Sequence, residues 1–521
     1  MTTMTTDRPI DLDALTLADL EAGALGGRPV VVLGAARSGL ALARFLAGLG
    51  AVVTVYDGRP AIELGTMPVV PTDSGGSIRL VSGPQVDPAA VLLGAALVAT
   101  SPSINPDYPT TEPRLRGALQ ALVEARRARD PNAPPIASEA DLFLRFCPAP
   151  TIGVTGTKGK TTTASLIAAI LAADPSHPVE LGGNIGRPLV ELLPRLTPEH
   201  RIVIELSELQ LPTLSRGTTM AVYTNVTADH LDRHGSLEAY RRVKRRLAEL
   251  VDPDGALVLN ADDPVVTAYA GLGTAPAILY RTNRPMPGGL GIVDDWIVAA
   301  GVERLPLIGG GPAATGPGGR IMPLGELAIP GRHNASNAMA AIAVGLAFGV
   351  APDAIRRAAA GFAGVEHRLE PAGRLGRIRF VNDSMATQPD AVIAALHAFP
   401  APIILIAGGR DKGIDLAGLA PEVASRVAAA VLIGESGPRL ERIFRAAGLP
   451  RTVQAETLEA AVERATDLAR ESLSASPPGS VATVLLSPAA ASFDMFEDYA
   501  ARGRAFKAAV AARTAVEEEE R

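Results

Sequence analysis

Short apolar runs recur along this chain, and three of them lead through a turn into a helical pattern. Residues 29–33 (PVVVL) precede GAARSG, residues 151–155 (TIGVT) precede a TKGK turn, and residues 377–383 (RIRFVND) precede the helical run PDAVIAALHAF. Strands that alternate with helices build mainly parallel sheets. The pattern predicts an α/β protein with Rossmann-like N- and C-terminal domains and a central P-loop ATPase-like domain. The expected domains are residues 1–137, 138–364 and 365–521.

Composition narrows the class of protein further. The chain has 521 residues, 47% apolar and 20% charged, so it can build several cores and is not a disordered scaffold. A net charge of −6 argues against general nucleic-acid binding. The single cysteine, Cys147, can form neither an internal disulfide nor a thiolate zinc site. The N-terminus has no signal-peptide core and the longest apolar runs are too short to span a bilayer, so we expect a cytoplasmic protein without membrane insertion.

The first turn is typical of a nucleotide-binding unit. GAARSG occupies residues 34–39, and Asp57 follows it by about 20 residues at the end of the next predicted strand. The strict dinucleotide fingerprint has a glycine where this chain has Ala36. A mononucleotide or nucleotide-sugar site is therefore as well supported as an NAD site.

A second glycine-rich turn, residues 156–161 (GTKGKT), lies between a predicted strand and a predicted helix. Backbone N–H groups of such a turn and the helix N-terminus can bind phosphate oxygens. Lys160 would reach the β- and γ-phosphates and the Thr161 hydroxyl would bind Mg²⁺. Val154 stands where the usual Walker motif has its first glycine, so the loop is a shortened form. Glu205, at the end of a predicted strand, is a candidate carboxylate ligand for Mg²⁺, or else a surface acid.

Lysine is rare in this chain, which makes the position of each lysine informative. There are five lysines among 49 basic residues. Lys244 lies in a predicted helix with Arg241, Arg242, Arg245 and Arg246, where arginine serves as the ordinary surface cation. A lysine there either needs an amine, which arginine cannot supply, or is one more solvated cation. Composition alone favours a solvated cation at Lys244. Without further information, His230 is interpreted as an ordinary loop histidine.

Nine motifs in register resemble the Mur ligase family over nearly the whole chain. They are GTKGKTTT, GGNIG (182–186), ELSELQL (205–211), TNVTADHLDRHGSLEAYRRVK (224–244), GRHNASNAMAA (331–341), HRLE (367–370), NDSMATQ (382–388), AGGRDKG (407–413) and LLSPAAASFDMF (485–496). The resemblance implies that the first domain binds a UDP-linked substrate, the second ATP and the third an amino acid. It also implies an ATP-dependent amide ligase that adds D-glutamate to UDP-N-acetylmuramoyl-L-alanine through an acyl phosphate, in peptidoglycan precursor synthesis. Small-molecule substrates and a monomeric state are expected.

The resemblance carries residue roles for the central domain. Catalytic roles fall on Lys160, His230 and Lys244, with a CO₂-derived carbamate on Lys244. Two Mg²⁺ ions would be held by Thr161, Glu205, His230 and Lys244. ATP would contact Gly156, Thr157, Lys158, Gly159, Lys160, Thr161, Thr162, Asn184, Asn334, Asn337, Arg368 and Asp383.

It also carries the sites of the other two substrates. The UDP-linked substrate would contact Ala36, Arg37, Ser38, Asp57, Gly58, Arg59, Ser101 and Ser103. The amino acid would contact Thr387, Lys412, Ser492, Phe493 and Tyr499.

Three departures from the family motifs bear on specificity. Met385 replaces the lysine of NDSKATN, Ser103 replaces the glycine of the SPG turn, and ELSELQ replaces ELSSFQ. A thioether cannot pair with a carboxylate, so L-glutamate or another amino acid remains an alternative to D-glutamate. A folylpolyglutamate synthase-like ligase is a further alternative, although that family begins with its ATPase domain. An ATP-binding switch and a dinucleotide oxidoreductase are weaker alternatives.

Overall fold

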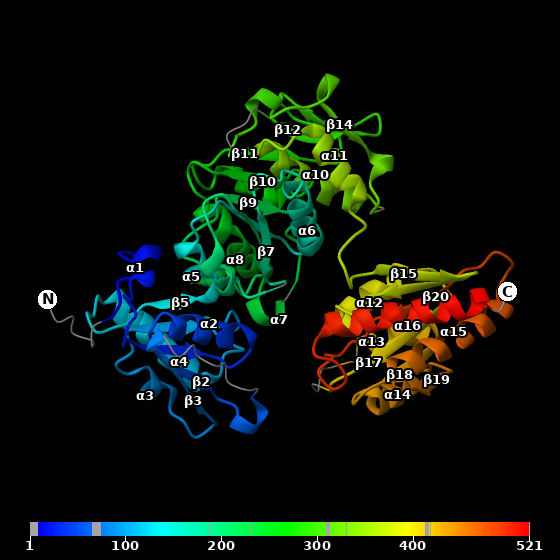
Figure 1. The fold of residues 1–521 in the computed structure, drawn as a ribbon, viewed down its shortest axis with the longest axis horizontal. Coiled ribbons are helices and arrows are strands. Elements are labelled where there is room, and N and C mark those ends of the chain that lie inside the picture. The colour runs from blue at the N-terminus through cyan, green and yellow to red at the C-terminus, as the bar shows by residue number, and fades with distance from the viewer. Residues whose placement is uncertain are drawn as a thin grey trace. The chain divides into compact units, whose positions relative to one another are not determined.

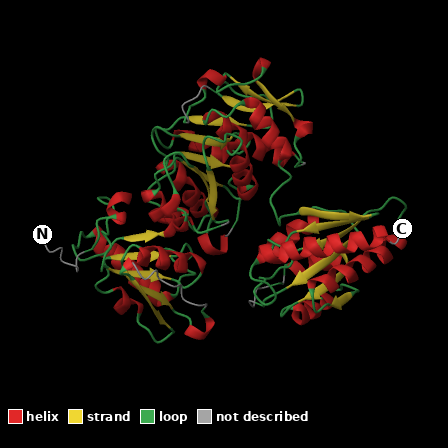
Figure 2. Cartoon of the chain, in the orientation of Figure 1, coloured by secondary structure: helices red, strands yellow, loops and turns green. Residues whose placement is uncertain are grey.

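The computed structural model describes residues 9–64, 74–185, 187–229, 231–308, 313–329, 331–411, 416 and 418–519. Two predicted site residues, His230 and Lys412, lie outside these ranges, as does Gly186 of the GGNIG motif. The chain divides into two compact units, Met1–Phe362 and Ala363–Arg521, which are described separately below. The first unit holds two sheets and the second holds one (Figures 1 and 2).

The first sheet has five parallel strands in the order β3-β2-β1-β4-β5. Its strands are β1 (Pro29–Leu33), β2 (Val52–Asp57), β3 (Ser77–Ser82), β4 (Leu97–Thr100) and β5 (Ile136–Ser138). Its helices are α1 (Leu17–Glu21), α2 (Arg37–Gly48), α3 (Pro88–Leu92) and α4 (Pro113–Arg127). Because side chains alternate along a strand, Val30 and Val32 pack in the cluster that includes α2, whereas Val31 and Leu33 pack with α4.

The second sheet has nine strands in the order β14-β13-β12-β11-β10-β9-β6-β8-β7. Strands β6 to β12 pair in parallel, and β13 and β14 add antiparallel strands at one edge. The strands are β6 (Thr151–Thr155), β7 (Val179–Gly183), β8 (Arg201–Glu205), β9 (Met220–Tyr223), β10 (Ala256–Asn260), β11 (Ala277–Tyr280), β12 (Gly289–Val293), β13 (Trp296–Ala300) and β14 (Arg320–Pro323). The helices are α5 (Glu139–Phe146), α6 (Lys160–Leu171), α7 (Leu231–His234), α8 (Leu237–Leu250), α9 (Pro264–Thr267), α10 (Arg332–Ala347) and α11 (Pro352–Gly361).

The second unit holds six strands in the order β15-β16-β20-β17-β18-β19, parallel except for β15. The strands are β15 (Glu370–Leu375), β16 (Ile378–Asn382), β17 (Ile403–Gly408), β18 (Val427–Ile433), β19 (Thr452–Gln454) and β20 (Ala482–Leu486). Helices α15 (Leu458–Ser474) and α16 (Tyr499–Glu519) cover one face (Figure 1). The other face is covered by α12 (Pro389–His397), α13 (Leu419–Arg426) and α14 (Gly437–Ala446).

These sheets confirm the predicted α/β class. Each of the three apolar runs that opened the prediction forms a strand, and the helical runs that follow them form α2, α6 and α12. The Gly/Pro-rich stretch at 285–330 contributes β12, β13 and β14 to the edge of the second sheet. The residue boundaries of the three domains stay a prediction. Within the described ranges, no helix is long and apolar enough to cross a membrane.

Candidate active site

The phosphate loop joins the end of β6 to the start of α6, and two glycines give it its shape. Gly156 has φ +144° and Gly159 has φ +87°, a region that favours glycine. The neighbouring strand end holds the loop, because Thr157 N–H donates to the Asn225 carbonyl (2.8 Å) and Lys158 N–H to the Asn225 side-chain oxygen (2.9 Å). The loop is thus fixed by its own glycines and by the segment after β9.

Lys160 opens α6 and folds back over this loop. Its ammonium nitrogen donates to the carbonyl oxygens of Gly156 (3.1 Å) and Thr157 (2.8 Å). Thr161 is buried in the same helical turn and Thr162 is half-buried, while Lys158 is exposed. Positive charge therefore gathers at a helix N-terminus, the arrangement that binds phosphate groups.

Glu205 lies next to the phosphate loop because β8 pairs with β6, with Val154 opposite Glu205. The side chain is 1% exposed. Oε1 accepts a hydrogen bond from Asn184 Nδ2 at 2.8 Å, whereas buried Oε2 has no hydrogen-bond partner among the described residues. A buried carboxylate oxygen without a donor fits a cation, and Mg²⁺ prefers oxygen ligands such as this one and the Thr161 hydroxyl. The surface-acid alternative for Glu205 is wrong.

Lys244 reaches the same loop from α8 and is 0% exposed. Its Nζ lies 3.1 Å from the Gly156 carbonyl oxygen, 3.3 Å from Thr155 Oγ1 and 5.5 Å from the centre of the Tyr240 ring. Burial, and then the charge of Lys160, lowers the pKa of Lys244 to about 7. The solvated-cation interpretation favoured by composition is therefore wrong, because α8 turns Lys244 inward and leaves Arg241, Arg242 and Arg245 exposed.

Two asparagines of α10 complete this side of the loop. Asn337 is 7% exposed and donates from Nδ2 to Asn334 Oδ1 at 3.2 Å. A Cβ placed on Gly159 would lie 2.7 Å from Asn337 Oδ1, so α10 packs directly against the loop. The structure therefore gathers the loop, Asn184, Glu205, Lys244 and Asn337 at one end of the central sheet. His230 falls outside the described residues.

A cavity of about 620 Å³ lies beside the first sheet, within the first unit. Four predicted UDP-site residues line it: Asp57, Gly58, Arg59 and Ser103. Asp57 accepts hydrogen bonds from the backbone N–H groups of Ala35 (2.9 Å) and Arg59 (3.0 Å) and from the Arg59 side chain. Burial opposes the charge of Asp57, but the hydrogen bonds from Arg59 and Ala35 outweigh it and lower the pKa.

The other predicted UDP-site residues are not part of the described lining of this cavity. Ala36, Arg37 and Ser38 form the start of α2. The Ser101 hydroxyl donates to the Leu33 carbonyl at 3.0 Å and would lie 2.8 Å from a Cβ on Gly34. Ser101 therefore requires a glycine at the β1–α2 turn.

In the second unit, predicted ATP and amino-acid residues lie at the carboxyl end of the sheet. Burial raises the pKa of Asp383 to about 6, although Ser487 Oγ donates to its carboxylate at 2.8 Å. Ser492 is 2% exposed and its hydroxyl has no hydrogen-bond partner among the described residues. Phe493 is 62% exposed. Thr387 is half-buried, Tyr499 begins α16, and Arg368 precedes β15. Lys412 lies outside the described residues.

Arg502 was not predicted from the sequence, although its buried guanidinium links the ends of three strands in the second unit. Arg502 of α16 is 1% exposed. It donates to the carbonyl oxygens of Ser384 (3.0 Å), Ala490 (3.1 Å) and Gly408 (3.4 Å), which follow or end the adjacent strands β16, β20 and β17. Nothing in the local sequence around Arg502 indicates these contacts, because its partners are remote in the chain.

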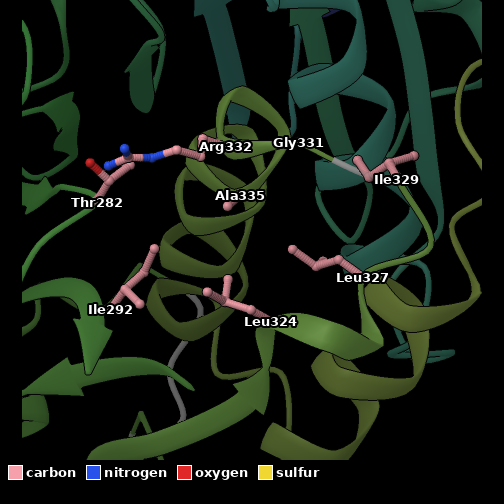
Figure 3. A pocket seen from close by; sticks show the side chains of 8 residues that line it. All are labelled: Thr282, Ile292, Leu324, Leu327, Ile329, Gly331, Arg332 and Ala335. Atoms are coloured by element: carbon pink, nitrogen blue, oxygen red, sulfur yellow. The ribbon is translucent and has the colours of Figure 1, made fainter. Parts of the chain in front are cut away.

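Another cavity, of about 420 Å³, lies between α10 and the β11–β14 region and contains none of the predicted site residues (Figure 3). Figure 3 shows apolar side chains of Ile292, Leu324 and Leu327 around it, with Arg332 extended beside Thr282. It is mainly apolar and is lined in part by Arg332 and Ala335 of α10, the helix whose Asn337 packs against the phosphate loop.

Comparisons with known proteins agree with this geometry. Residues 154–345 match the Mur ligase middle domain and residues 367–490 match the Mur ligase, glutamate ligase domain. The UDP-N-acetylmuramoylalanine–D-glutamate ligase of Symbiobacterium thermophilum is 38% identical over 92% of this chain and 97% of its own length. The enzyme of the same name from Chlorobaculum tepidum is 38% identical over 93% of this chain and 97% of its own length.

A solved structure supports the fold alone. MurF from Acinetobacter baumannii is 16% identical and aligns over 95% of this chain and 98% of its own with a TM-score of 0.50. The phosphate loop, the buried lysine and the two matching domain models together lead to one assignment: this chain belongs to the Mur ligase family.

Proposed function

We propose that this chain is an ATP-dependent ligase that joins D-glutamate to UDP-N-acetylmuramoyl-L-alanine in peptidoglycan precursor synthesis. The observation that carries the proposal is the phosphate loop with buried Glu205 and Lys244 against it, in a chain that matches curated ligases of that name over 92% of its length. The pairing of a nucleotide-sugar pocket with a phosphate loop in one unit fits a substrate acid that ATP activates.

The proposed reaction has two balanced steps. A carboxylate oxygen of the UDP-linked acid attacks the γ-phosphorus of ATP, forming an acyl phosphate and releasing ADP. The amine of D-glutamate then attacks the acyl carbon, losing a proton and expelling inorganic phosphate as the amide forms. The loop N–H groups, Lys160 and the α6 N-terminus stabilise the charge on the transferred phosphoryl group. Asn334 and Asn337 are proposed to contact ATP, on the adenine side that the resemblance implies.

Thr161 and Glu205 would hold a first Mg²⁺, with His230 and Lys244 at a second. Bound Mg²⁺ supplies positive charge that neutralises phosphate oxygens and orients them for in-line transfer. Glu205 Oε2, which has no hydrogen-bond partner in the described part of the chain, and the Thr161 hydroxyl are both oxygen ligands of the kind that Mg²⁺ prefers. Asn184 fixes the other oxygen of Glu205 and so orients the carboxylate.

Lys244 has the properties that carbamylation requires. A pKa of about 7 leaves a large fraction of the amine uncharged near neutral pH, and only that form attacks CO₂. The reaction forms an N–C bond and releases a proton, which gives a carboxylate-like anion close to Lys160. Arginine could not react in this way, which supports a lysine within an arginine-rich helix.

The amino-acid site is proposed for the second unit, from Thr387, Lys412, Ser492, Phe493 and Tyr499. The Ser492 hydroxyl, which has no hydrogen-bond partner among the described residues, is available as a donor to a carboxylate. Arg368 and Asp383 are proposed as ATP contacts. D-Glutamate is supported by the names of the relatives, and Met385 makes the choice of amino acid the point to test.

The test is a phosphate-release assay with a panel of D- and L-amino acids. We expect release that requires both UDP-N-acetylmuramoyl-L-alanine and D-glutamate, with L-glutamate much slower. Release that is indifferent to both substrates would contradict the ligase proposal, and a preference for L-glutamate would contradict the choice of amino acid. Met385→Lys should raise turnover with D-glutamate if the methionine weakens its binding.

A further inference from the structure

The cavity beside the first sheet is lined by three arginines, each paired with a carboxylate. Arg59 pairs with Asp57, and Arg114 pairs with Glu112. Both guanidinium side chains are about half exposed, at 52% and 48%. Exposed ion pairs contribute little free energy because water screens them. The third arginine, Arg233, differs from these two in its burial.

Arg233 is 23% exposed and its partner Glu208 is 7% exposed at the side chain. The Arg233 Nη1–Glu208 Oε1 distance is 2.8 Å. Buried Nε of Arg233 has no hydrogen-bond partner among the described residues. A guanidinium has five N–H donors in a fixed fork, so one carboxylate does not exhaust it. Arg233 is therefore the least exposed of the three lining arginines, and a single carboxylate leaves part of its donor capacity unused.

The backbone of Glu208 is anchored, which limits where its carboxylate can hold Arg233. Its backbone carbonyl accepts a hydrogen bond from the Tyr108 hydroxyl at 2.9 Å, and Tyr108 is 4% exposed. Leu209, the next residue, lines the cavity. The family motif has a serine where this chain has Glu208, so the carboxylate that orients Arg233 is a feature of this sequence.

The segment that carries Arg233 also touches the phosphate loop. The His234 ring packs edge-on against Tyr108 (5.9 Å between centres) and against Tyr240 (5.4 Å). The Tyr240 hydroxyl lies 3.0 Å from Thr157 Oγ1, in the loop. Packed side chains thus run from the wall of the cavity to the phosphate loop, and an anion bound at Arg233 would lie on the side of the cavity that adjoins the loop.

We propose that Arg233, oriented by Glu208, binds an oxyanion of the UDP-linked substrate and so directs the acid of that substrate toward the phosphate loop. The inference rests on the proposed function, because it takes the UDP-linked acid as the occupant of the cavity. The oxyanion belongs either to the diphosphate or to the carboxylate of the muramoyl-alanine part. Arg233 contacts substrate, and Glu208 is a positioning residue.

The test uses Arg233→Met, Arg233→Gln and Glu208→Gln in the full chain. Arg127→Met is the matched control, because Arg127 pairs with Glu124 on the surface with both side chains at least 70% exposed. Calorimetric titration measures binding of UDP and of UDP-N-acetylmuramoyl-L-alanine, and steady-state kinetics measure KM for each substrate. Thermal melting reports whether each variant is folded.

Loss of a charge-assisted hydrogen bond should raise the Kd for the UDP-linked acid roughly 10- to 100-fold in the Arg233 variants. Glu208→Gln keeps the shape but weakens the hold on Arg233, and a rise of about 3- to 10-fold is expected. KM for ATP and the control should stay within about twofold. If the Kd for UDP rises by a similar factor, Arg233 contacts the diphosphate. If only the Kd for the full substrate rises, Arg233 contacts the carboxylate.

Wild-type affinity for both ligands in folded Arg233 variants would overturn the inference. If both Arg233 variants fail to fold, wild-type affinity in Glu208→Gln overturns it instead. If the wild-type chain itself neither binds the UDP-linked acid nor releases phosphate with it, the proposed function fails rather than the role of Arg233.

Discussion

The Lys244 ammonium nitrogen lies 3.1 Å from the carbonyl oxygen of Gly156, the first residue of the phosphate loop. This contact joins a helix that begins some 80 residues later in the chain to the turn between β6 and α6. The loop carbonyls accept from both Lys160 and Lys244. Two amines therefore share one short stretch of backbone, and burial, followed by repulsion from Lys160, lowers the pKa of Lys244.

Lys244→Ala should abolish ligase activity, with a loss of at least about 100-fold in kcat. The variant lacks the amine that would be carbamylated, so added bicarbonate should not restore activity. Acetate or formate should restore part of it, because a small carboxylate can occupy the space that the carbamate would fill. Phosphate release with both substrates present measures each effect.

The matched control for Lys244 is Arg242→Ala, an exposed cation on the same helix. It should keep wild-type kcat and show no response to acetate. Full activity of Lys244→Ala, or of Lys244→Arg, would contradict the proposed role, since arginine keeps the charge but cannot form a carbamate.

Glu139→Gln should raise the free energy of unfolding relative to wild type, and this gain should grow as the pH rises. Burial raises the pKa of Glu139 from 4.5 to about 7, against hydrogen bonds from the N–H groups of Val190 and Leu189. The folded state then binds more protons than the unfolded state between those two values, so the wild type loses stability as the pH rises from 4.5 to 7. Above pH 7 the wild type has lost this whole contribution to its unfolding free energy, which amounts to roughly 3 kcal/mol.

Urea denaturation at pH 5 and pH 8 measures this difference. The gap in unfolding free energy between Glu139→Gln and wild type should widen by a few kcal/mol at pH 8. Glu191→Gln removes a more exposed carboxylate from the same region and serves as the control. A gap that is the same at both pH values would show that Glu139 is not held in the way described.

Gly159→Ala should lower both stability and affinity for ATP. The residue has φ +87°, and an added Cβ would lie 2.7 Å from Asn337 Oδ1. We expect a loss of about 1–2 kcal/mol in unfolding free energy and a KM for ATP that rises at least about tenfold. Gly94→Ala is the control, since Gly94 has φ +72° with no atom within 4 Å of the new Cβ. An unchanged KM for ATP in Gly159→Ala would contradict the role given to the loop.

Arg502→Met should destabilise the second unit and weaken binding of D-glutamate. The variant leaves the carbonyl groups of Ser384, Ala490 and Gly408 without this donor in a buried place. A loss of roughly 3 kcal/mol or more in unfolding free energy is expected. KM for D-glutamate should rise while KM for ATP stays near wild type. Equal changes in both values would show a general loss of folding instead.

The strands and their order of appearance could be predicted from local pattern. Apolar runs such as residues 29–33 and 151–155 carry their own signal, because burial on both faces of a parallel sheet demands it. The phosphate loop could also be predicted, because its glycines and Lys160 are adjacent in the chain. The family resemblance supplied the site roles of residues that the local pattern alone could not identify.

Contacts between remote residues could not be predicted. Arg502 meets Ser384 across 118 positions, and Arg233 meets Glu208 across 25, without any periodic signal that pairs them. Lys244 is intermediate. Tyr240, Lys244, Leu247 and Ala248 lie on one helical face and are all buried. That spacing was present in the sequence, but the surrounding arginines obscured it.

In the proposed reaction, ATP activates the acid of a UDP-linked substrate for capture by D-glutamate. The most direct test uses UDP-N-acetylmuramoyl-L-alanine labelled with ¹⁸O in its carboxylate, with mass spectrometry of the released phosphate and of the nucleotide product. An acyl phosphate predicts one ¹⁸O atom in each phosphate and a product that has gained D-glutamate. Phosphate without label, or label-free hydrolysis of ATP without a new amide, would contradict the account.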